Sequence, residues 1–257
     1  MPEIDSLWPL VLAAARGGGA DAVLAAAADP LIALYLPLCR PANGRPFTIG
    51  HLGQSLDGFV ATAQGESLFI TGEENVVHMH RLRALCDAVV VGASTVAADD
   101  SRLTTRLVPG PNPLRVVIDP RRRLPASRRL FSDGAAPTLL VCDAAHARPG
   151  ERFGGAEVAG LPARGGRLDY AAILALLHAR GCRTVFVEGG GTTVAGFLAA
   201  GLLDRLQVTV APALLGDGLP GLRLPAVPRL ADAAPLACRA VRMGDDVLFD
   251  CELRTGG

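Results

Sequence analysis

The segment VFVEGGGTTVAGFL, residues 185–198, joins an apolar run to the carboxylate of Glu188, three glycines and two threonines. Glycine loses more backbone freedom on folding than any other residue, and Gly189, Gly190 and Gly191 bring no side chain to pack. Such a run indicates that another group comes close to the backbone. The simplest candidate is a phosphate-bearing ligand at the start of a helix, because unpaired N–H groups and the helix dipole favour anions there.

A second segment repeats this design. DAVVVGASTVAADD, residues 87–100, passes from an apolar stretch into Gly92 and then Thr95. Ligands of open α/β sheets bind at the carboxyl ends of strands, so both turns are expected at one edge of a sheet. The alternative is that both are ordinary strand–helix turns. A Rossmann fingerprint does not fit, because Val194 stands where its third glycine is required.

The composition excludes several classes of protein. The chain has 257 residues, half of them hydrophobic, which suffices for one large or two small domains. Its net charge is zero, so no global field attracts nucleic acid or an anionic membrane. All 25 basic residues are arginine, which excludes a Schiff-base lysine and the lysine of a P-loop. We expect a cytoplasmic protein, because the N-terminus is unlike a secretory signal and no apolar run approaches the ~18 residues of a membrane span.

Cysteine and histidine spacing favours neither a disulfide framework nor a metal site. His78 and His80 lie two apart on an expected helix and point to different faces, so no metal site is predicted. Thiols inside apolar segments are usually small buried hydrophobes, which fits a reducing compartment. The six cysteines are scattered without a C-x-x-C pair, at Cys39, Cys86, Cys142, Cys182, Cys238 and Cys251.

The chain divides into an alanine-rich helical extension, residues 1–45, and a body, residues 46–257, that alternates strand-like and helix-like segments. Residues 204–216 and 245–253 form an expected antiparallel pair at the end. The pattern predicts an α/β sandwich with a mainly parallel sheet and an antiparallel C-terminal edge. Other strands are expected at residues 47–52, 87–93, 114–119, 137–142 and 183–188, and helices at 72–86, 168–181 and 192–201.

Five motifs occur in an order that resembles a known family. They are QSLDGFVATAQGES, ITGEE, HRLRALCDAVVVGASTVAADDSRLTTR, NPLRVVID and VEGGGTTVAGFLAAGLLDRLQVTVAPALLG. The chain resembles, over roughly residues 47–252, the C-terminal reductase domain of the bifunctional riboflavin-biosynthesis deaminase/reductase proteins and their stand-alone pyrimidine reductase relatives. Residues 1–45 contain neither the H-x-E nor the P-C-x-x-C signature of a zinc deaminase, so we expect a free-standing reductase.

The resemblance implies a dihydrofolate-reductase-like three-layer α/β sandwich, NADPH as cofactor and a homodimer. It also implies reduction of the ribosyl side chain of a ribosylaminopyrimidine 5′-phosphate to the ribityl form. The substrate is then 5-amino-6-(5-phosphoribosylamino)uracil or its 2,5-diamino analogue. One alternative is a reductase of a related pyrimidine or pterin in a specialised pathway. Another is a non-catalytic NADPH-binding regulatory protein. The presence of Arg83, Arg106 and Glu188 argues against that alternative.

The resemblance also implies a set of cofactor-binding residues in this chain. Thr95 and Asp99 have helix N-capping as the alternative role, since both residue types do it well. Phe69 has a place in the core as its alternative. The residues that the resemblance assigns to NADPH are Gln54, Phe69, Thr95, Asp99, Gly189, Gly190, Gly191 and Thr192.

The family motifs also imply a substrate set. Arginine suits a phosphate because its planar fork donates two hydrogen bonds at once. Glu188 is the expected catalytic group, favouring a developing cation on the imine nitrogen; its alternative role is to accept N–H bonds from the glycine turn. At position 51 the riboflavin enzymes typically carry a lysine, and this chain has histidine. The implied substrate residues are His51, Ser67, Arg83, Leu103, Arg106 and Glu188.

Overall fold

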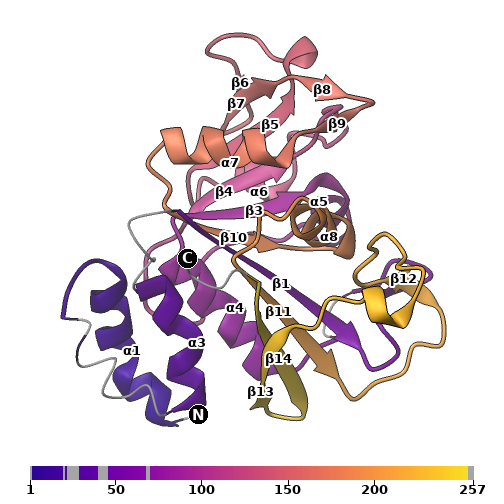
Figure 1. Ribbon diagram of the computed structural model, residues 1–257. Coiled ribbons are helices and arrows are strands. Elements are labelled where there is room, and N and C mark those ends of the chain that lie inside the picture. Colours follow the sequence, from indigo (N-terminus) through magenta and orange to yellow (C-terminus); the bar gives the residue numbers. More distant parts are fainter. Residues whose placement is uncertain (1, 20, 22–28, 40–45, 68–69, 254–257) are drawn as a thin grey trace.

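The computed structural model describes residues 2–19, 21, 29–39, 46–67 and 70–253. Within this part of the chain the main sheet has ten strands, in the order β13-β14-β11-β1-β10-β3-β4-β5-β7-β6 (Figure 1). The strands are β1 (Phe47–Ser55), β3 (Ala88–Gly92), β4 (Leu114–Ile118), β5 (Thr138–Asp143), β6 (Arg152–Phe153), β7 (Ala156–Leu161), β10 (Thr184–Glu188), β11 (Arg205–Ala211), β13 (Ala237–Met243) and β14 (Asp246–Glu252).

The sheet is parallel from β11 to β7. It turns antiparallel at both edges, where β14 pairs with β11 and β13, and β6 pairs with β7. Two small antiparallel pairs stand apart, β2 (Phe59–Thr62) with β12 (Gly218–Pro220) and β8 (Ala163–Arg164) with β9 (Arg167–Leu168). The predicted mainly parallel sheet with an antiparallel C-terminal edge is confirmed.

Helices cover both faces of the sheet and give three layers (Figure 1). One face carries α1 (Pro2–Ala15), α3 (Pro30–Cys39), α4 (Glu73–Leu85), α5 (Ala93–Asp99) and α6 (Arg129–Ser132), and the other carries α7 (Tyr170–Ala179) and α8 (Gly191–Ala199). Short 3₁₀ helices span Ala144–His146 and Leu230–Asp232. Among the described helices, none combines the length and apolarity needed to cross a bilayer.

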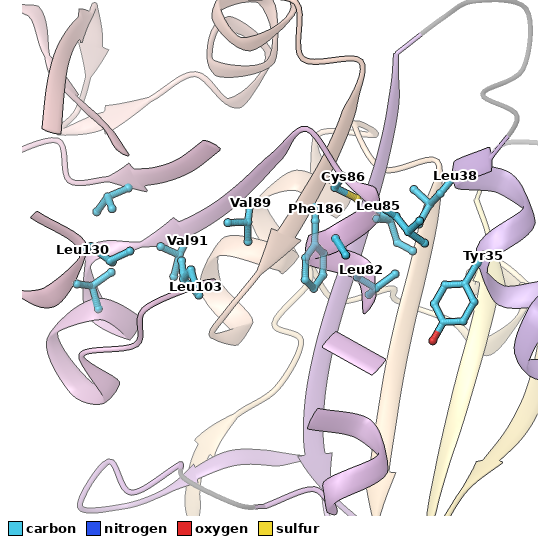
Figure 2. Close-up of a cluster of buried hydrophobic side chains, with 14 of the residues drawn as sticks. Tyr35, Leu38, Leu82, Leu85, Cys86, Val89, Val91, Leu103, Leu130 and Phe186 are labelled. Carbon is cyan, nitrogen blue, oxygen red and sulfur yellow. The ribbon is translucent and has the colours of Figure 1, made fainter. Parts of the chain in front are cut away.

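Alternation along the strands divides the core into two clusters. Val89 and Val91 of β3 pack toward the α4 face, while Val90 packs toward α7 and α8, because successive strand residues point to opposite faces. Figure 2 shows Val89, Val91 and Phe186 in the first cluster, together with Leu82 from α4. Burial on both sides explains why β3 is an uninterrupted apolar run.

The helical extension is part of this packing. Helices α1 and α3 contact each other and α4 (Figure 1). Trp8, Tyr35 and Leu38 are buried in the cluster that also holds Leu82 and Phe186. Pro2–Ala15 and Pro30–Cys39 of the extension are helical, and the assignment of residues 1–45 as a separate extension stays a prediction.

The structure adds two features to the expected picture. Strands β6, β7 and β13 join the sheet, although none of the three was predicted. Cys238 of β13 lies opposite Cys251 of β14, and the two form a disulfide. The preference for unpaired cysteines is therefore wrong for this pair. The other four, Cys39, Cys86, Cys142 and Cys182, are free and buried.

Candidate active site

Two helices begin side by side at the carboxyl edge of the sheet. Strands β10 and β3 are parallel neighbours, and α8 and α5 follow them directly. The residues at the N-cap positions are Gly190 and Gly92, and neither helix has a side-chain cap. The first turn of a helix carries N–H groups without intrahelical partners, so the start of α8, a nine-residue helix, is suited to an anion.

Protein atoms approach the glycine run closely. Gly189 has a φ of 138°, which favours glycine, and the Gly190 N–H donates to Thr95 Oγ1 over 3.0 Å. A Cβ on Gly191 would lie 1.6 Å from the carbonyl oxygen of Gly221. The prediction that another group comes close to this backbone is confirmed. At Gly191 that group is a carbonyl of the loop after β12.

The predicted cofactor residues gather at this edge. Thr95 and Asp99 lie four apart on α5, so they share one face. Asp99 accepts a hydrogen bond from the Ser67 hydroxyl over 2.6 Å. Helix N-capping, the alternative for both residues, is wrong, because Gly92 occupies the cap of α5.

The rest of the cofactor set is placed as follows. Gln54 lies near the end of β1, and its Oε1 would be 2.5 Å from a Cβ on Gly221. Thr192 is exposed in the first turn of α8. Phe69 lies outside the described residues. The roles of all these residues stay predictions.

Arg83 and Glu188 form a partly buried ion pair. Arg83 Nε donates to Glu188 Oε2 over 2.8 Å, and Arg83 Nη2 donates to Oε1. Arg83 lies near the end of α4 and is 5% exposed. The Glu188 carboxylate is therefore engaged by a guanidinium, which replaces the alternative in which it accepts N–H bonds from the glycine turn.

His80 contacts both predicted substrate arginines. Its Nδ1 accepts the main-chain N–H of Arg106 over 3.1 Å, and its Nε2 lies 3.4 Å from Arg83 Nη1. Burial lowers the pKa of His80 to about 3, and the charges of Arg83 and Arg106 act in the same direction. A neutral imidazole can therefore accept the Arg106 N–H at pH 7. Sequence reasoning considered His80 only as a metal ligand and missed this contact.

Positive charge collects around Arg106. The pKa of its guanidinium is lowered by burial and by the charges of Arg83, Arg102 and Arg129. Among the described residues, neither Arg102 nor Arg106 forms an ion pair with a carboxylate. Such a surplus of positive charge is the electrostatic setting that binds an anion.

The loop between α5 and Arg106 is held in a strained conformation. Asp100 and Leu103 have φ angles of 42° and 49°, in a region that non-glycine residues rarely occupy. Buried Arg115 donates to the carbonyl of Arg102 over 3.1 Å. Leu103 is 1% exposed and packs in the core (Figure 2). A substrate contact of Leu103 stays a prediction.

His51 is a buried neutral residue beside Glu188. The two are register partners on β1 and β10. His51 Nε2 lies 3.0 Å from Asn75 Oδ1 and 3.1 Å from Thr209 Oγ1. Burial lowers the pKa of His51 to about 4, so at pH 7 it carries no charge, unlike the lysine typical of the resembled enzymes. Whether it touches substrate stays a prediction.

Comparison with known proteins decides the family. The model of the RibD C-terminal domain matches residues 46–233. The chain belongs to the RibD C-terminal domain family. It is similar to the 2,5-diamino-6-ribosylamino-4(3H)-pyrimidinone 5′-phosphate reductase of Methanothermobacter thermautotrophicus, with 37% identity over 80% of this chain and 97% of that protein. The reductase of the same name from Archaeoglobus fulgidus is 35% identical over 67% and 83%.

A solved structure supports the assignment to the RibD C-terminal domain family. The deaminase/5-amino-6-(5-phosphoribosylamino)uracil reductase of Thermotoga maritima superposes with a TM-score of 0.69 and 25% identity. The match covers 86% of this chain and 59% of that protein, so the chain spans about three fifths of the bifunctional relative.

The RibD C-terminal domain match covers every predicted site residue, because it begins at residue 46. It leaves out α1 and α3, although both are packed on α4. Sequence reasoning also missed Asn75, whose side chain bonds both His51 and Thr209. The available signal was a polar residue on the buried face of α4.

Proposed function

We propose that this protein is an NADPH-dependent reductase that converts the ribosyl side chain of a ribosylaminopyrimidine 5′-phosphate to the ribityl form in riboflavin biosynthesis. The observation that carries the proposal is the position of Arg83, Arg106 and Glu188 beside the edge where α8 begins without a side-chain cap. The printed names of the two archaeal relatives support the 2,5-diamino pyrimidine as substrate.

The residues at the carboxyl edge fit the proposed cofactor. The uncapped start of α8 suits a phosphate, and the Thr95 hydroxyl fixes the turn before it through Gly190. NADPH supplies a hydride when bound. The residues proposed to hold it are Gln54, Phe69, Thr95, Asp99, Gly189, Gly190, Gly191 and Thr192.

The role proposed for the residues of the substrate site is to bind the substrate and to orient it. Arg106 is proposed to take the 5′-phosphate, because it stands among positive charges without a carboxylate partner in the described part of the chain. Glu188 is proposed to favour positive charge on the nitrogen of the ring-opened substrate, and Arg83 holds its carboxylate in place. Ser67 and Leu103 are proposed to line the same site. The neutral His51 beside Glu188 adds no competing charge.

The test follows NADPH absorbance with the purified protein and each pyrimidine phosphate, the deaminated form and the 2,5-diamino form. Oxidation with the 2,5-diamino form is the expected result. Absence of NADPH binding would refute the cofactor assignment. Tight NADPH binding without turnover of either pyrimidine would favour a related pyrimidine or pterin as substrate, a candidate motivated by His51 in place of lysine.

We also propose that the protein is a cytoplasmic homodimer. The support for the dimer is that seven of the ten exposed large apolar side chains in the described part of the chain fall between residues 214 and 249. Sedimentation analysis of the purified protein should give twice the mass of one chain, and a monomer at micromolar concentration would refute the proposal. The seven are Leu214, Leu219, Leu224, Val227, Leu230, Leu236 and Phe249.

A further inference from the structure

We propose that the N-terminal helices α1 and α3 position the two substrate arginines, Arg83 and Arg106, with Tyr35 and Trp8 as the positioning residues. The inference rests on the proposed function, since it concerns the substrate half of that site. It assigns a role to a part of the chain that the family match leaves out.

Tyr35 of α3 begins a buried chain of hydrogen bonds. Its hydroxyl lies 2.7 Å from His78 Nδ1, and His78 Nε2 lies 2.7 Å from Gln207 Oε1. The amide nitrogen of Gln207 donates to Asp250 Oδ1 over 3.2 Å, so its oxygen accepts from His78. His78 Nδ1 is then the acceptor of the Tyr35 hydroxyl. All four residues are at most 1% exposed.

This chain fixes the helix that carries Arg83. His78 lies on α4, five residues before Arg83, and its ring centroid is 5.8 Å from that of His51. His51 in turn is the register partner of Glu188. The Tyr35 hydroxyl is thus linked through His78 and His51 to Glu188, the residue that forms the ion pair with Arg83.

Helix α1 adds contacts to the same stretch of α4. Asp5 accepts a hydrogen bond from Arg81 Nη2 over 2.5 Å, and the Arg81 guanidinium lies 5.7 Å from the centroid of the Trp8 ring. The Trp8 ring stacks edge-on against Tyr35 at 5.7 Å. Arg81 is 1% exposed, so α1 supplies a carboxylate and an aromatic face to a buried charge.

Trp8 also holds the segment that follows Arg106. Its Nε1–H donates to the carbonyl of Pro109 over 2.7 Å. Gly110 has a φ of 150°, and a Cβ there would lie 2.6 Å from Ala84 Cβ and 3.5 Å from Leu12. The segment is therefore clamped between α1 and α4. Both arginine-bearing elements contact the extension: α4 packs against α1 and α3 (Figure 1), and the segment after Arg106 is bonded to Trp8.

A purely stabilising role would predict a different response to mutation. If α1 and α3 only cover apolar surface, small changes in Tyr35 and Trp8 should lower stability and leave substrate affinity alone. If they position the arginines, loss of the Tyr35 hydroxyl leaves His78 Nδ1 buried without a donor, and α4 must shift to satisfy it. Substrate binding should then weaken while cofactor binding does not.

The experiment compares the full-length wild type with Tyr35→Phe and with Tyr170→Phe. Tyr170 is the chain's other tyrosine and lies on α7, on the opposite face of the sheet, which makes it a matched control. We expect the KM for 2,5-diamino-6-ribosylamino-4(3H)-pyrimidinone 5′-phosphate to rise about fivefold or more in Tyr35→Phe, the size of one lost hydrogen bond. The Kd for NADPH should stay within about twofold, and Tyr170→Phe should match the wild type in both.

A Tyr35→Phe protein that keeps the wild-type KM overturns the proposal. If this variant does not fold, Trp8→Phe takes its place, because phenylalanine keeps an aromatic ring and loses only the N–H to Pro109. The same shift in KM is expected, and a wild-type KM overturns the proposal.

A failure of the proposed function can be distinguished from a failure of the positioning role. A wild type that turns over no pyrimidine phosphate refutes the reductase, and calorimetric binding of ribose 5-phosphate then tests the extension. Weaker binding by the variants supports the positioning role. Equal binding overturns it, and so does a wild type that binds no ribose 5-phosphate, since there is then no phosphate site to position.

Discussion

Arg83 and Glu188, 105 residues apart in the sequence, meet through two parallel hydrogen bonds between guanidinium and carboxylate. Such a fork fixes both partners, so Glu188 is presented to the site in one orientation. Glu188→Gln keeps the shape and removes the charge. We expect kcat to fall about tenfold or more, because a charge aimed at the reacting centre acts mainly on the transition state.

Steady-state kinetics with saturating NADPH measure this effect. Arg83→Ala should be the more damaging change, because it leaves the carboxylate partly buried without its partner. An unchanged kcat in Glu188→Gln would rule out Glu188 as a catalytic group.

Arg106→Ala should raise the KM for the phosphorylated substrate about tenfold to a hundredfold, since one charge-assisted contact contributes roughly 1.5–3 kcal/mol. The Kd for NADPH should not change. Arg148→Ala, at an exposed arginine outside the site, is the control. Weaker NADPH binding in Arg106→Ala would show that the assignment of Arg106 to the substrate site, and not to the cofactor site, is wrong.

Gly191→Ala tests the contact between α8 and the loop after β12. The added Cβ would lie 1.6 Å from the Gly221 carbonyl oxygen, so the backbone must move. We expect a loss of about 1–3 kcal/mol in the free energy of unfolding, together with weaker NADPH binding. Gly19→Ala is the matched control, because a Cβ there meets no atom of the described residues within 4 Å. Equal behaviour of the two variants would contradict the prediction.

Stability should depend on pH through the buried histidines. Burial lowers the pKa of His51 to about 4 and of His78 and His80 to about 3, below their ordinary value of 6.5. The unfolded chain therefore binds more protons between pH 6.5 and these values. The free energy of unfolding should have its full value above pH 6.5. Below that pH it should fall by at most about 1.4 kcal/mol per pH unit for each histidine.

Urea denaturation at pH 7.5 and pH 5.5 measures this dependence. His51→Gln, which cannot titrate, should show a smaller difference between the two pH values. A wild type that is equally stable at both would contradict the assignment of neutral buried histidines at His51, His78 and His80.

The disulfide between β13 and β14 should be measurable as well. Cys238 and Cys251 are separated by 13 positions, a loop whose closure contributes about 3 kcal/mol in the chain-entropy account. Dithiothreitol should lower the urea midpoint of the wild type. The double variant Cys238→Ser, Cys251→Ser should start at the lower midpoint and not respond. Identical midpoints with and without dithiothreitol would contradict a stabilising disulfide.

The local hydrophobic pattern of the sequence predicted most strands of the parallel sheet. The run at residues 88–91 is apolar without a break, because β3 is buried on both faces, and such runs are visible in a sequence. Strand β13 gave no such signal, since Ala237, Cys238, Arg239 and Ala240 are all exposed at the sheet edge. The disulfide was missed for the same reason.

The place of the candidate site could be predicted from residue types, and its contacts could not. Glycines and threonines after apolar runs indicated the carboxyl edge, and the family motifs supplied the arginines. The pairing of Arg83 with Glu188 and the packing of Gly221 on Gly191 join segments far apart in the chain, so no local pattern encodes them. His80 was missed because its role depends on the main-chain N–H of Arg106.

Trp8 is the protein's single tryptophan, and it is 2% exposed among α1, α3 and the segment after Arg106. Its intrinsic fluorescence therefore originates at one place, the junction between the extension and the elements that bear the arginines. Release of the extension would expose the indole to water and shift its emission to the red while the sheet stays folded. The chain thus carries its own optical reporter of that junction, and no label has to be attached.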